Sequence, residues 1–508
     1  MTEQVRPEPV PAHSSPVLVR LVGALGAVTL VALAVAAAFL LGRQIEAEEW
    51  PILVSATGLA VYIAVALNNP RHALFLWVVT APFARFAYLN LEFGRGIPDL
   101  TLNRLMTGVL VALLLAQLAI GRRRAPRVTF LDLCVLAFCG TLAMSVSSAL
   151  VGAKSAMQSY FDLLVVPTAL YFLGRSLITN QRQLRHMMVM LLVIGLYLGL
   201  LAVREQITGD VWFYPEDRSV VYTSSIRRVV ALLGNPAYIA VSIAMAVPWA
   251  WYLYLNAKRG RLWLLLAIAA MCVGVYMCMN RSGWAGLAIG LFVMALFVKR
   301  FRGIFLLLLV AAAIAASVYW VVIISSATVQ ERLTAQGPIE YRRETWQVAW
   351  NMIRDHPLFG LGWDNFRQVY SRYARWDIYL RATPTPHNTY LWVILTGGVV
   401  AWVPFMLMLL TTSFSALGLY FRALPRRSQV PYADLAGTFL ASMAAIWAPA
   451  LVMDVLTGYY NTMLTFLIMG AFFGVVGWER WSWRLKTGAL PGPEPSRPAD
   501  APPGAMAP

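Results

Sequence analysis

Long apolar runs follow one another along this chain, and they constrain its fold more than any other feature. A helix needs roughly 20 apolar residues to cross a bilayer core of about 30 Å, and runs of this kind recur through most of the 508 residues. Hydrophobic residues make up 59% of the chain and charged residues 13%, which is about half the charged share of a soluble domain. The sequence therefore predicts an all-α polytopic membrane protein.

The length rule places about fourteen transmembrane helices, within a range of 12 to 14. The third, sixth and tenth are weakened by Arg85, by Asp162 and by short length, respectively. The expected spans cover residues 17–42, 51–67, 73–91, 100–121, 128–151, 157–178, 186–203, 229–256, 262–280, 283–298, 303–324, 388–421, 432–453 and 458–478.

Clusters of Lys and Arg in the short loops give an independent test, since such clusters mark the cytoplasmic side. With the N-terminus inside, every alternate loop carries such a cluster, whereas the loops between them carry mostly carboxylates. The net charge of +17 therefore orients the helices, and we do not expect a nucleic-acid partner. Both termini are predicted to be cytoplasmic.

This topology divides the chain into seven regions. Two of them are substantial extracytoplasmic loops, and both tails are too rich in proline and small residues to build a core. The regions are a disordered cytoplasmic tail (1–16), N-terminal transmembrane helices (17–203), a smaller extracytoplasmic loop (204–228), central transmembrane helices (229–324), a large extracytoplasmic loop (325–387), C-terminal transmembrane helices (388–478) and a cytoplasmic Pro-rich tail (479–508).

The large loop, residues 325–387, is a polar island with eight arginines and six carboxylates. Apolar residues recur at i, i+3, i+4 and i+7 from Trp346 and again from Phe366, so two amphipathic helices are expected there. Gly360 and Gly362 would form the turn between them, and His356 would shape the loop just before it. Tryptophan and tyrosine favour the headgroup layer, so we expect both helices to lie on the bilayer.

Three arginines are candidates for an anionic ligand on the same face. Arg281 lies in a tight hairpin between two apolar runs, and Arg227 and Arg228 end the smaller loop. An arginine at membrane depth is costly and normally has a charged partner or an aqueous cavity. Three guanidiniums without matching carboxylates nearby in sequence favour a diphosphate, which suits their forked donors. The alternatives are a snorkelling Arg281 and a pair that attracts lipid headgroups.

His387 stands where the large loop re-enters the membrane, just before Asn388. Because an unperturbed histidine has a pKa of about 6.5, it is the side chain best suited to accept a proton near neutral pH. The alternative is a hydrogen-bonded structural histidine. No spacing of His, Asp and Glu indicates a metal site.

Several short motifs in one order, spacing and sidedness together resemble the O-antigen ligase and polymerase superfamily. The resemblance covers about residues 225–400, whereas the first seven spans are similar only in being hydrophobic helices. The motifs are Arg228-Val229-Val230-Ala231-Leu232-Leu233-Gly234-Asn235-Pro236, Asn280-Arg281-Ser282-Gly283, Arg343 to Trp346, Asp355-His356-Pro357-Leu358-Phe359-Gly360-Leu361-Gly362, and His387-Asn388-Thr389-Tyr390-Leu391 with Gly397-Gly398.

This resemblance implies a glycosyltransferase of the bacterial inner membrane that uses a polyprenyl (undecaprenyl) diphosphate-linked glycan as donor. It implies an inverting reaction without metal or other cofactor at the extracytoplasmic face. On matched positions, Arg228 and Arg281 would hold the diphosphate, with Arg227 and Arg343 beside them, and His387 would activate the acceptor hydroxyl.

Three functions remain open at this stage. A ligase moves the glycan to a different acceptor, such as a lipid-linked glycan, whereas a polymerase extends a glycan by repeat units; the two share the donor. A transporter or flippase for the lipid-linked glycan would also need arginines for the diphosphate, but it should carry charged residues on both faces of a central cavity. The distinctive charges here fall on one face, so we expect an enzyme.

Overall fold

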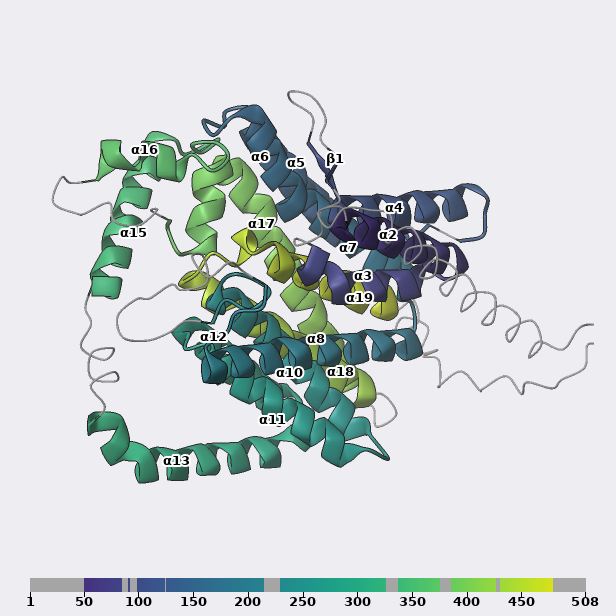
Figure 1. The fold of residues 1–508 in the computed structure, drawn as a ribbon, viewed down its shortest axis with the longest axis vertical. Helices are drawn as coiled ribbons and strands as arrows, with labels where there is room; N and C mark the ends of the chain where they lie inside the picture. Colours follow the sequence, from purple (N-terminus) through teal and green to yellow (C-terminus); the bar gives the residue numbers. More distant parts are fainter. Residues whose placement is uncertain are drawn as a thin grey trace, which may run out of the picture.

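The structure of the chain is a computed structural model, which describes residues 50–84, 90–91, 98–123, 125–213, 229–325, 337–374, 385–425 and 430–477. These residues are predominantly helical (Figure 1), and the strands among them form one two-residue antiparallel pair, β1 (Asn90–Leu91) with β2 (Leu100–Thr101). The all-α class predicted from the apolar runs is confirmed. The expected span 17–42, both tails, Arg227 and Arg228 lie outside the described residues.

The helices follow the apolar runs closely, because backbone groups that leave water must bond within the segment. Short 3₁₀ and π segments join some of them, namely η1 (Phe161–Val165), η2 (Lys299–Phe301), η4 (Pro449–Leu451) and η5 (Val455–Thr457). The apolar helices are α2 (Trp50–Asn68), α3 (Pro70–Ala84), α4 (Leu102–Ala119), α5 (Phe130–Val146), α6 (Ala153–Tyr160) continued by α7 (Val166–Leu177), α8 (Gln181–Thr208), α10 (Pro236–Asn256), α11 (Arg261–Met277), α12 (Arg281–Phe297), α13 (Arg302–Ser325), α17 (Thr389–Ala423), α18 (Val430–Trp447) and α19 (Tyr459–Val476).

Eight helical stretches in the described part of the chain are long and apolar enough to cross a membrane, and four further apolar helices are shorter. The protein is therefore an integral membrane protein, but the count of fourteen spans is not confirmed. One difference is local: the span expected at 73–91 contains α3 up to Ala84 and has the strand β1 at Asn90–Leu91, with 85–89 outside the described residues.

Asp162, which weakened the sixth expected span, lies in the π turn η1. Arg104 of α4 meets its carboxylate with both arms of the guanidinium, with Nε to Oδ1 at 2.8 Å and Nη2 to Oδ2 at 2.9 Å. A bidentate pair of this kind offsets the cost of a charge near the apolar region. The charge is compatible with the helix because it has a partner.

Basic residues that the sequence placed on one side also lie together. Arg123, after α4, donates from Nη1 to the carbonyl of Ser176 at 3.1 Å, and Arg175 at the end of α7 donates from Nη2 to the carbonyl of Arg127 at 2.7 Å. The C-terminal ends of α4 and α7 and the start of α5 therefore meet, as the alternation of loop charges requires.

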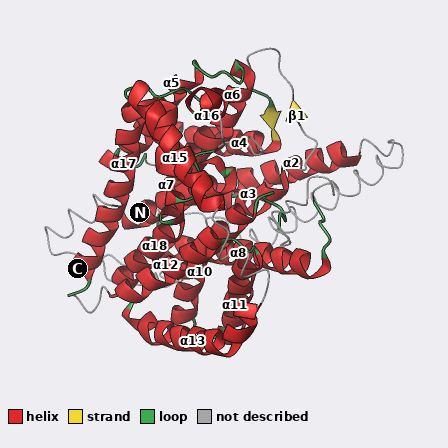
Figure 2. Cartoon of the chain, turned by 90° about the vertical axis from the view of Figure 1, so that its left-hand side faces the viewer, coloured by secondary structure: helices red, strands yellow, loops and turns green. Residues whose placement is uncertain are grey.

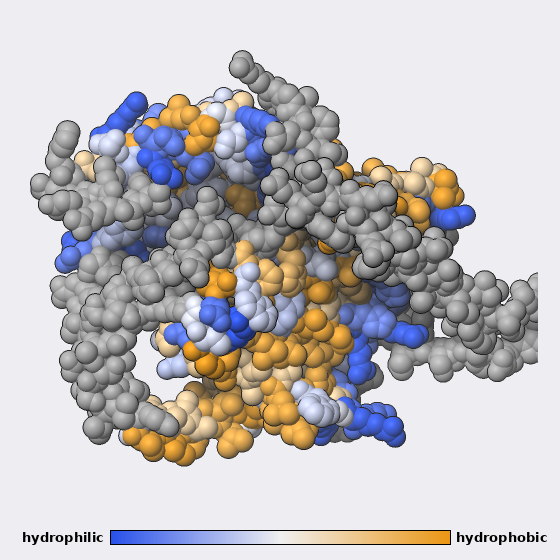
Figure 3. All heavy atoms as spheres, in the orientation of Figure 1, coloured by the Kyte–Doolittle hydropathy of each residue, from blue (hydrophilic) through white to orange (hydrophobic). Residues whose placement is uncertain are grey.

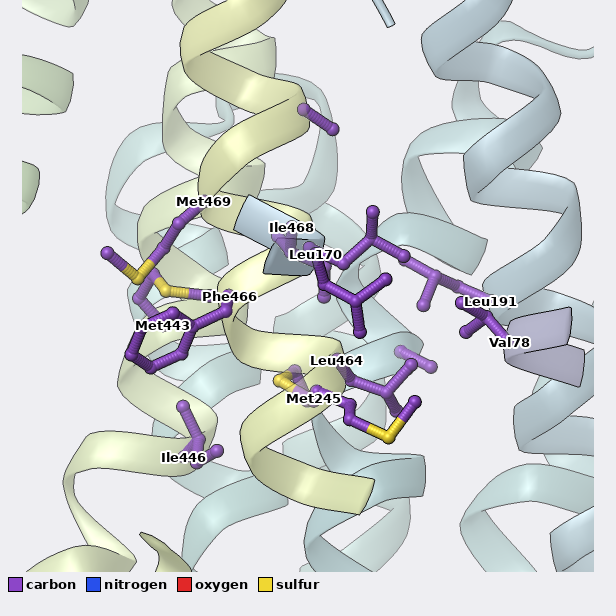
Figure 4. Close-up of a cluster of buried hydrophobic side chains, with 14 of the residues drawn as sticks. Val78, Leu170, Leu191, Met245, Met443, Ile446, Leu464, Phe466, Ile468 and Met469 are labelled. Carbon is purple, nitrogen blue, oxygen red and sulfur yellow. The ribbon is translucent and has the colours of Figure 1, made fainter. Parts of the chain in front are cut away.

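The centre of the molecule is α19, which packs along α7 and contacts α10 (Figure 1). Its Phe472 stacks on Phe439 of α18, with ring centroids 3.9 Å apart. Figure 4 shows Leu464, Phe466 and Ile468 of α19 among side chains from α3, α7, α8, α10 and α18. Gly470 lets the two backbones approach, because a Cβ there would collide with the carbonyl of Tyr171 in α7. Small residues at helix interfaces favour such packing in membranes.

Two amphipathic helices, α15 (Gly337–Asp355) and α16 (Phe366–Tyr373), confirm the two helices expected in the large loop. They lie together at one end of the bundle, whereas α13 runs along the opposite edge in the view of Figure 1, and Figure 2 shows α15 crossing in front of α7 and α17. Hydrophilic residues gather over α16, and hydrophobic residues cover α13 (Figure 3). The α13 side chains from Leu306 to Val310 are exposed, as expected of a helix that faces lipid.

Candidate functional site

The turn between α15 and α16 is fixed inside the bundle by two side chains. Trp363 is 1% exposed and donates from Nε1 to the Ser159 hydroxyl at 2.6 Å. Asn365 accepts the N–H of Leu150 at 2.7 Å and donates from Nδ2 to the carbonyl of Ser148 at 2.7 Å. The turn therefore has a fixed position relative to α5 and α6, on which the geometry of the site depends.

The same turn fills a break in α17. Gly398 has φ 64° and ψ −165°, which interrupts the helix. Backbone groups on both sides of this break form hydrogen bonds with the turn instead of with the helix. The Leu361 N–H donates to the Leu395 carbonyl at 2.7 Å, and the Val399 N–H donates to the Pro357 carbonyl at 2.9 Å. Irregular backbone is tolerated near an apolar region when protein groups satisfy it in this way.

Gly360 and Gly362 form this turn, as the sequence predicted, with φ of +67° and +100°. Both approach other backbone or side-chain groups so closely that a Cβ would collide, at Gly360 with α17 and at Gly362 with Ser148. His356 precedes the turn; its side chain is exposed, and its backbone carbonyl accepts the Gly360 N–H at 3.1 Å. His356 thus contributes to the loop through its backbone.

A cavity of about 560 Å³ lies between this turn, α15 and the ends of the apolar helices. Its wall combines the start of α10, the hairpin before α12, the segment before α17 and the segment before α19. The chemically distinctive lining residues are Tyr238, Asn280, Ser282, Tyr341, Arg342, Asp364, Arg367, His387, Asp454 and Thr457.

His387 lines the cavity in a backbone conformation that non-glycine residues rarely adopt, with φ +44°. Asp454, between η4 and η5, accounts for this conformation. Its Oδ1 accepts the Asn388 N–H at 2.8 Å, and it also accepts the backbone N–H of His387. Asn388 then begins α17, because its side chain accepts the N–H groups of Tyr390 at 3.0 Å and Leu391 at 3.1 Å.

The imidazole of His387 also faces the Asp454 carboxylate. Nδ1 lies 3.9 Å from Oδ2, which is within ion-pair range but longer than a hydrogen bond. The His387 side chain is 44% exposed and the Asp454 side chain 8% exposed. Burial raises the pKa of Asp454 to about 6, although the two backbone N–H groups and the charge of Arg342 oppose the rise. The carboxylate is therefore ionised at neutral pH, beside an imidazole that is open to the cavity.

Arg342 is the arginine of α15 that lines the cavity. Burial lowers its pKa and the charge of Arg281 lowers it further, whereas Asp454 raises it. Arg281, the first residue of α12, is exposed between the lining residues Asn280 and Ser282. The two guanidiniums thus lie close enough to repel each other.

The structure does not bring Arg343 to this cavity. Its side chain is exposed, and it is not part of the lining, whereas the adjacent Arg342 is. A helix turns by about 100° per residue, so neighbouring arginines in α15 face different directions. The structure therefore places Arg342, rather than Arg343, beside His387 and Arg281.

Sequence reasoning missed two residues of the site, Arg342 and Asp454. Two adjacent arginines cannot be told apart until the facing of α15 is known. Asp454 did carry a signal, since it is a carboxylate in a very short polar interruption between two apolar runs, on the same predicted side as His387. Only the fold shows that this carboxylate meets His387 across 67 residues of chain.

A comparison with family models matches residues 266–406 to Wzy_C, described as O-Antigen ligase. The match confirms the resemblance to the O-antigen ligase superfamily that the motifs predicted, and it supports a membrane enzyme of the O-antigen ligase and polymerase family. It spans the cavity wall from Asn280 to Thr396, whereas Tyr238 and Asp454 lie outside it. No curated protein matches the chain.

Proposed function

We propose that this protein is a glycosyltransferase that moves a glycan from a polyprenyl diphosphate onto an acceptor hydroxyl. One observation carries the proposal: an open imidazole, His387, faces the ionised Asp454 in a cavity that also holds Arg342. A base and a cation in one cavity are what a displacement of diphosphate by a hydroxyl needs. The site would face the extracytoplasmic side of the bacterial inner membrane, with both termini in the cytoplasm.

In the proposed reaction, the acceptor oxygen forms a bond to the anomeric carbon, and the bond from that carbon to the diphosphate oxygen breaks. His387 takes the proton of the hydroxyl, and the ionised Asp454 stabilises the imidazolium that results. The leaving diphosphate takes the bonding electron pair, and Arg342 with Arg281 stabilises its charge. Attack opposite to the leaving group inverts the configuration at the anomeric carbon.

The arginines supply the positive charge that a metal ion supplies in other phosphate sites. A guanidinium stays protonated at any relevant pH and offers forked donors to phosphate oxygens. We therefore propose that transfer needs no metal. Arg228 and Arg227, which lie outside the described residues, would complete the diphosphate site from the loop that precedes Val229.

The test is transfer by the purified chain in lipid nanodiscs, with an undecaprenyl diphosphate-linked glycan as donor and candidate acceptors, read as product mass on a gel. We expect a new glycosidic bond, formed equally well with and without EDTA. A lipid A-core product identifies a ligase, and a longer glycan on the polyprenyl lipid identifies a repeat-unit polymerase. In a parallel assay in sealed vesicles, movement of the donor across the membrane without a new glycosidic bond would overturn the proposed enzyme activity in favour of a transporter.

A further inference from the structure

Asp454 lies in a short non-helical stretch between η4 and η5, and this stretch is buried. The residues on either side of it, Met453 and Val455, are 5% and 1% exposed. A buried irregular stretch has backbone N–H and C=O groups that no helix satisfies, so these groups need other partners. Because the reaction derived above depends on the place of the Asp454 carboxylate, the partners of this stretch matter to the chemistry.

One hydroxyl supplies partners on both sides of Asp454. Thr389, the first residue of α17, donates from Oγ1 to the Met453 carbonyl at 3.0 Å, and the same oxygen accepts the Val455 N–H at 2.9 Å. A threonine hydroxyl has one proton to donate and lone pairs that accept, so it can make both bonds at once. Thr389 is 0% exposed and does not line the cavity. It therefore acts on the protein and not on a ligand.

The two residues before Thr389 bond the carboxylate itself. The backbone N–H groups of His387 and Asn388 donate to Asp454. Three consecutive residues thus hold the same stretch, two of them by the side chain of Asp454 and the third by the backbone that flanks it. Together these bonds set the place of the carboxylate relative to the imidazole, whose Nδ1 lies 3.9 Å from Oδ2.

The next residue, Tyr390, joins the same two parts of the chain by a hydrogen bond farther from Asp454. Its hydroxyl donates to the carbonyl of Trp447, the last residue of α18, at 3.0 Å. Neither Tyr390 nor Trp447 lines the cavity of His387. This bond helps to hold α17 against the end of α18 without involving the residues that flank Asp454, so Tyr390 is a matched comparison for Thr389.

We propose that Thr389 is a positioning residue for the reaction: its hydroxyl fixes the backbone on both sides of Asp454 and so keeps the carboxylate facing the His387 imidazole. The inference rests on the proposed function. Because Thr389 acts through Asp454, its loss should weaken the stabilisation of the imidazolium and leave the binding of donor and acceptor unchanged.

The first test is the rate of transfer by three variants of the full chain in lipid nanodiscs. Thr389→Val removes both hydrogen bonds and should lower kcat about fivefold, with KM for donor and acceptor unchanged, because a displaced group acts less well on the reacting hydroxyl. Thr389→Ser keeps the hydroxyl and should recover most of the rate. Tyr390→Phe should transfer at the wild-type rate. If Thr389→Val does not fold, Thr389→Cys replaces it, since a thiol is only a weak donor and acceptor.

A double-mutant cycle separates positioning from a general loss of packing. In Asp454→Asn, the charge that Thr389 positions is already absent, so adding Thr389→Val should lower kcat little further. The melting temperature should fall in both backgrounds, because the Met453 carbonyl and the Val455 N–H lose their partner. An equal loss of kcat in both backgrounds would mean that Thr389 acts independently of Asp454.

A spectroscopic measurement tests the same inference without transfer. The chain has five histidines, and carbon-13-labelled histidine identifies the His387 signal by its absence from His387→Ala. A nearby carboxylate favours the protonated imidazole, so the titration of this signal should move to lower pH in Asp454→Asn. It should move in the same direction in Thr389→Val, and it should stay at the wild-type position in Thr389→Ser and Tyr390→Phe.

The inference is overturned by a normal rate and a normal His387 titration in Thr389→Val, by an equal loss in Tyr390→Phe, or by an equal loss in both Asp454 backgrounds. The proposed function fails in a different way. If the His387 titration shifts as expected but the wild type transfers no glycan, the glycosyltransferase is refuted, whereas the effect of Thr389 on the two side chains stands.

Discussion

The arginines inside the helix bundle and those at the cavity have opposite surroundings. In the bundle, Arg104 (6% exposed) pairs with Asp162 (40% exposed), and Arg175 (8% exposed) pairs with Asp132 (3% exposed). At the cavity, burial lowers the pKa of Arg342, and the charge of a neighbouring cation, Arg281, lowers it further. Asp454, the carboxylate whose charge raises the pKa of Arg342, is already bonded to the backbone of His387 and Asn388.

This difference separates arginines that hold the fold from those that bind a ligand. A buried arginine paired with a carboxylate completes its interactions within the chain, so its loss leaves an uncompensated charge. Cations gathered beside one another repel in the empty protein, and an anionic ligand removes that repulsion. The comparison therefore predicts loss of stability from one group and loss of activity from the other.

His387→Ala should give the largest effect, a fall of about 10³-fold in kcat with folding unchanged, as expected when a general base is removed. The measurement is the rate of transfer in nanodiscs, with melting temperature as the check on folding. His356→Ala is the matched control, because that side chain is exposed and does not line the cavity. A rate within a few-fold of wild type in His387→Ala would remove the base from the mechanism.

Arg175→Ala should destabilise the protein by about 3 kcal/mol, because Asp132 would keep its charge without its guanidinium. Tyr171 and Thr129 still donate to Asp132, so we do not expect complete unfolding. Melting temperature and yield measure the effect, and Arg175→Lys should recover part of it. The comparison fails if Arg175→Ala melts normally and yet loses transfer per folded molecule.

Arg342→Ala should have the converse phenotype, a loss of about 10²-fold in kcat, because a preorganised donor to the leaving group is removed. Its melting temperature should stay the same or rise, since the repulsion with Arg281 is relieved. Arg342→Lys should recover only part of the rate, because an ammonium keeps the charge and loses the fork. A large fall in stability would place Arg342 with the bundle arginines instead.

The sequence predicts some parts of the fold and not others. The apolar runs predicted the helices well, because a backbone that leaves water must bond to itself. The paired glycines predicted the turn before α16, since φ above zero is inexpensive only for glycine. The break in α17 at Gly398 was not predicted. The Gly397-Gly398 pair alone does not require a break, which forms because the turn between α15 and α16 supplies the missing backbone hydrogen bonds.

The sequence predicts only part of the site, because some of its residues are marked by local patterns and others only by tertiary contacts. His387 and Arg281 could be chosen as isolated polar residues at the ends of apolar runs. Arg342 and Asp454 depend on tertiary geometry: the facing of α15 decides between two adjacent arginines, and the packing of α17 against the segment before α19 brings Asp454 to His387. No local pattern contains either fact.

Asp454→Asn should lower the rate of transfer about tenfold at pH 7.5, because a neutral amide stabilises the His387 imidazolium less than a carboxylate does. Burial raises the pKa of Asp454 from 3.8 to about 6, so wild-type transfer should fall as pH drops through about 6, where this carboxylate takes up a proton and no longer stabilises the imidazolium. In the variant, the part of this fall in rate that comes from protonation of Asp454 should be absent. The measurement is a pH–rate profile, and an unchanged acidic limb contradicts the role of the carboxylate.

The stability of Asp454→Asn relative to wild type should change with pH in one direction. Because the folded pKa is the higher one, the contribution of protonated Asp454 is present below about 3.8 and is lost as pH rises through about 6. The melting temperature of Asp454→Asn minus that of wild type should therefore increase between pH 4 and pH 7 and then level off. A difference that falls with pH would mean that the carboxylate is better stabilised by the fold than its burial indicates.

Arg343→Ala should have the smallest effect, less than about twofold in rate and within about 0.5 kcal/mol in stability, as for an ordinary exposed side chain. It is the closest available match to Arg342→Ala, since the two positions share residue type, helix and charge and differ in whether they line the cavity. If charge density on α15 alone attracted the donor, the two variants would lose similar activity, and the loss would shrink as salt is raised. A hundredfold gap between them that persists at high salt would show that position in the cavity, rather than net positive charge, makes an arginine part of the site.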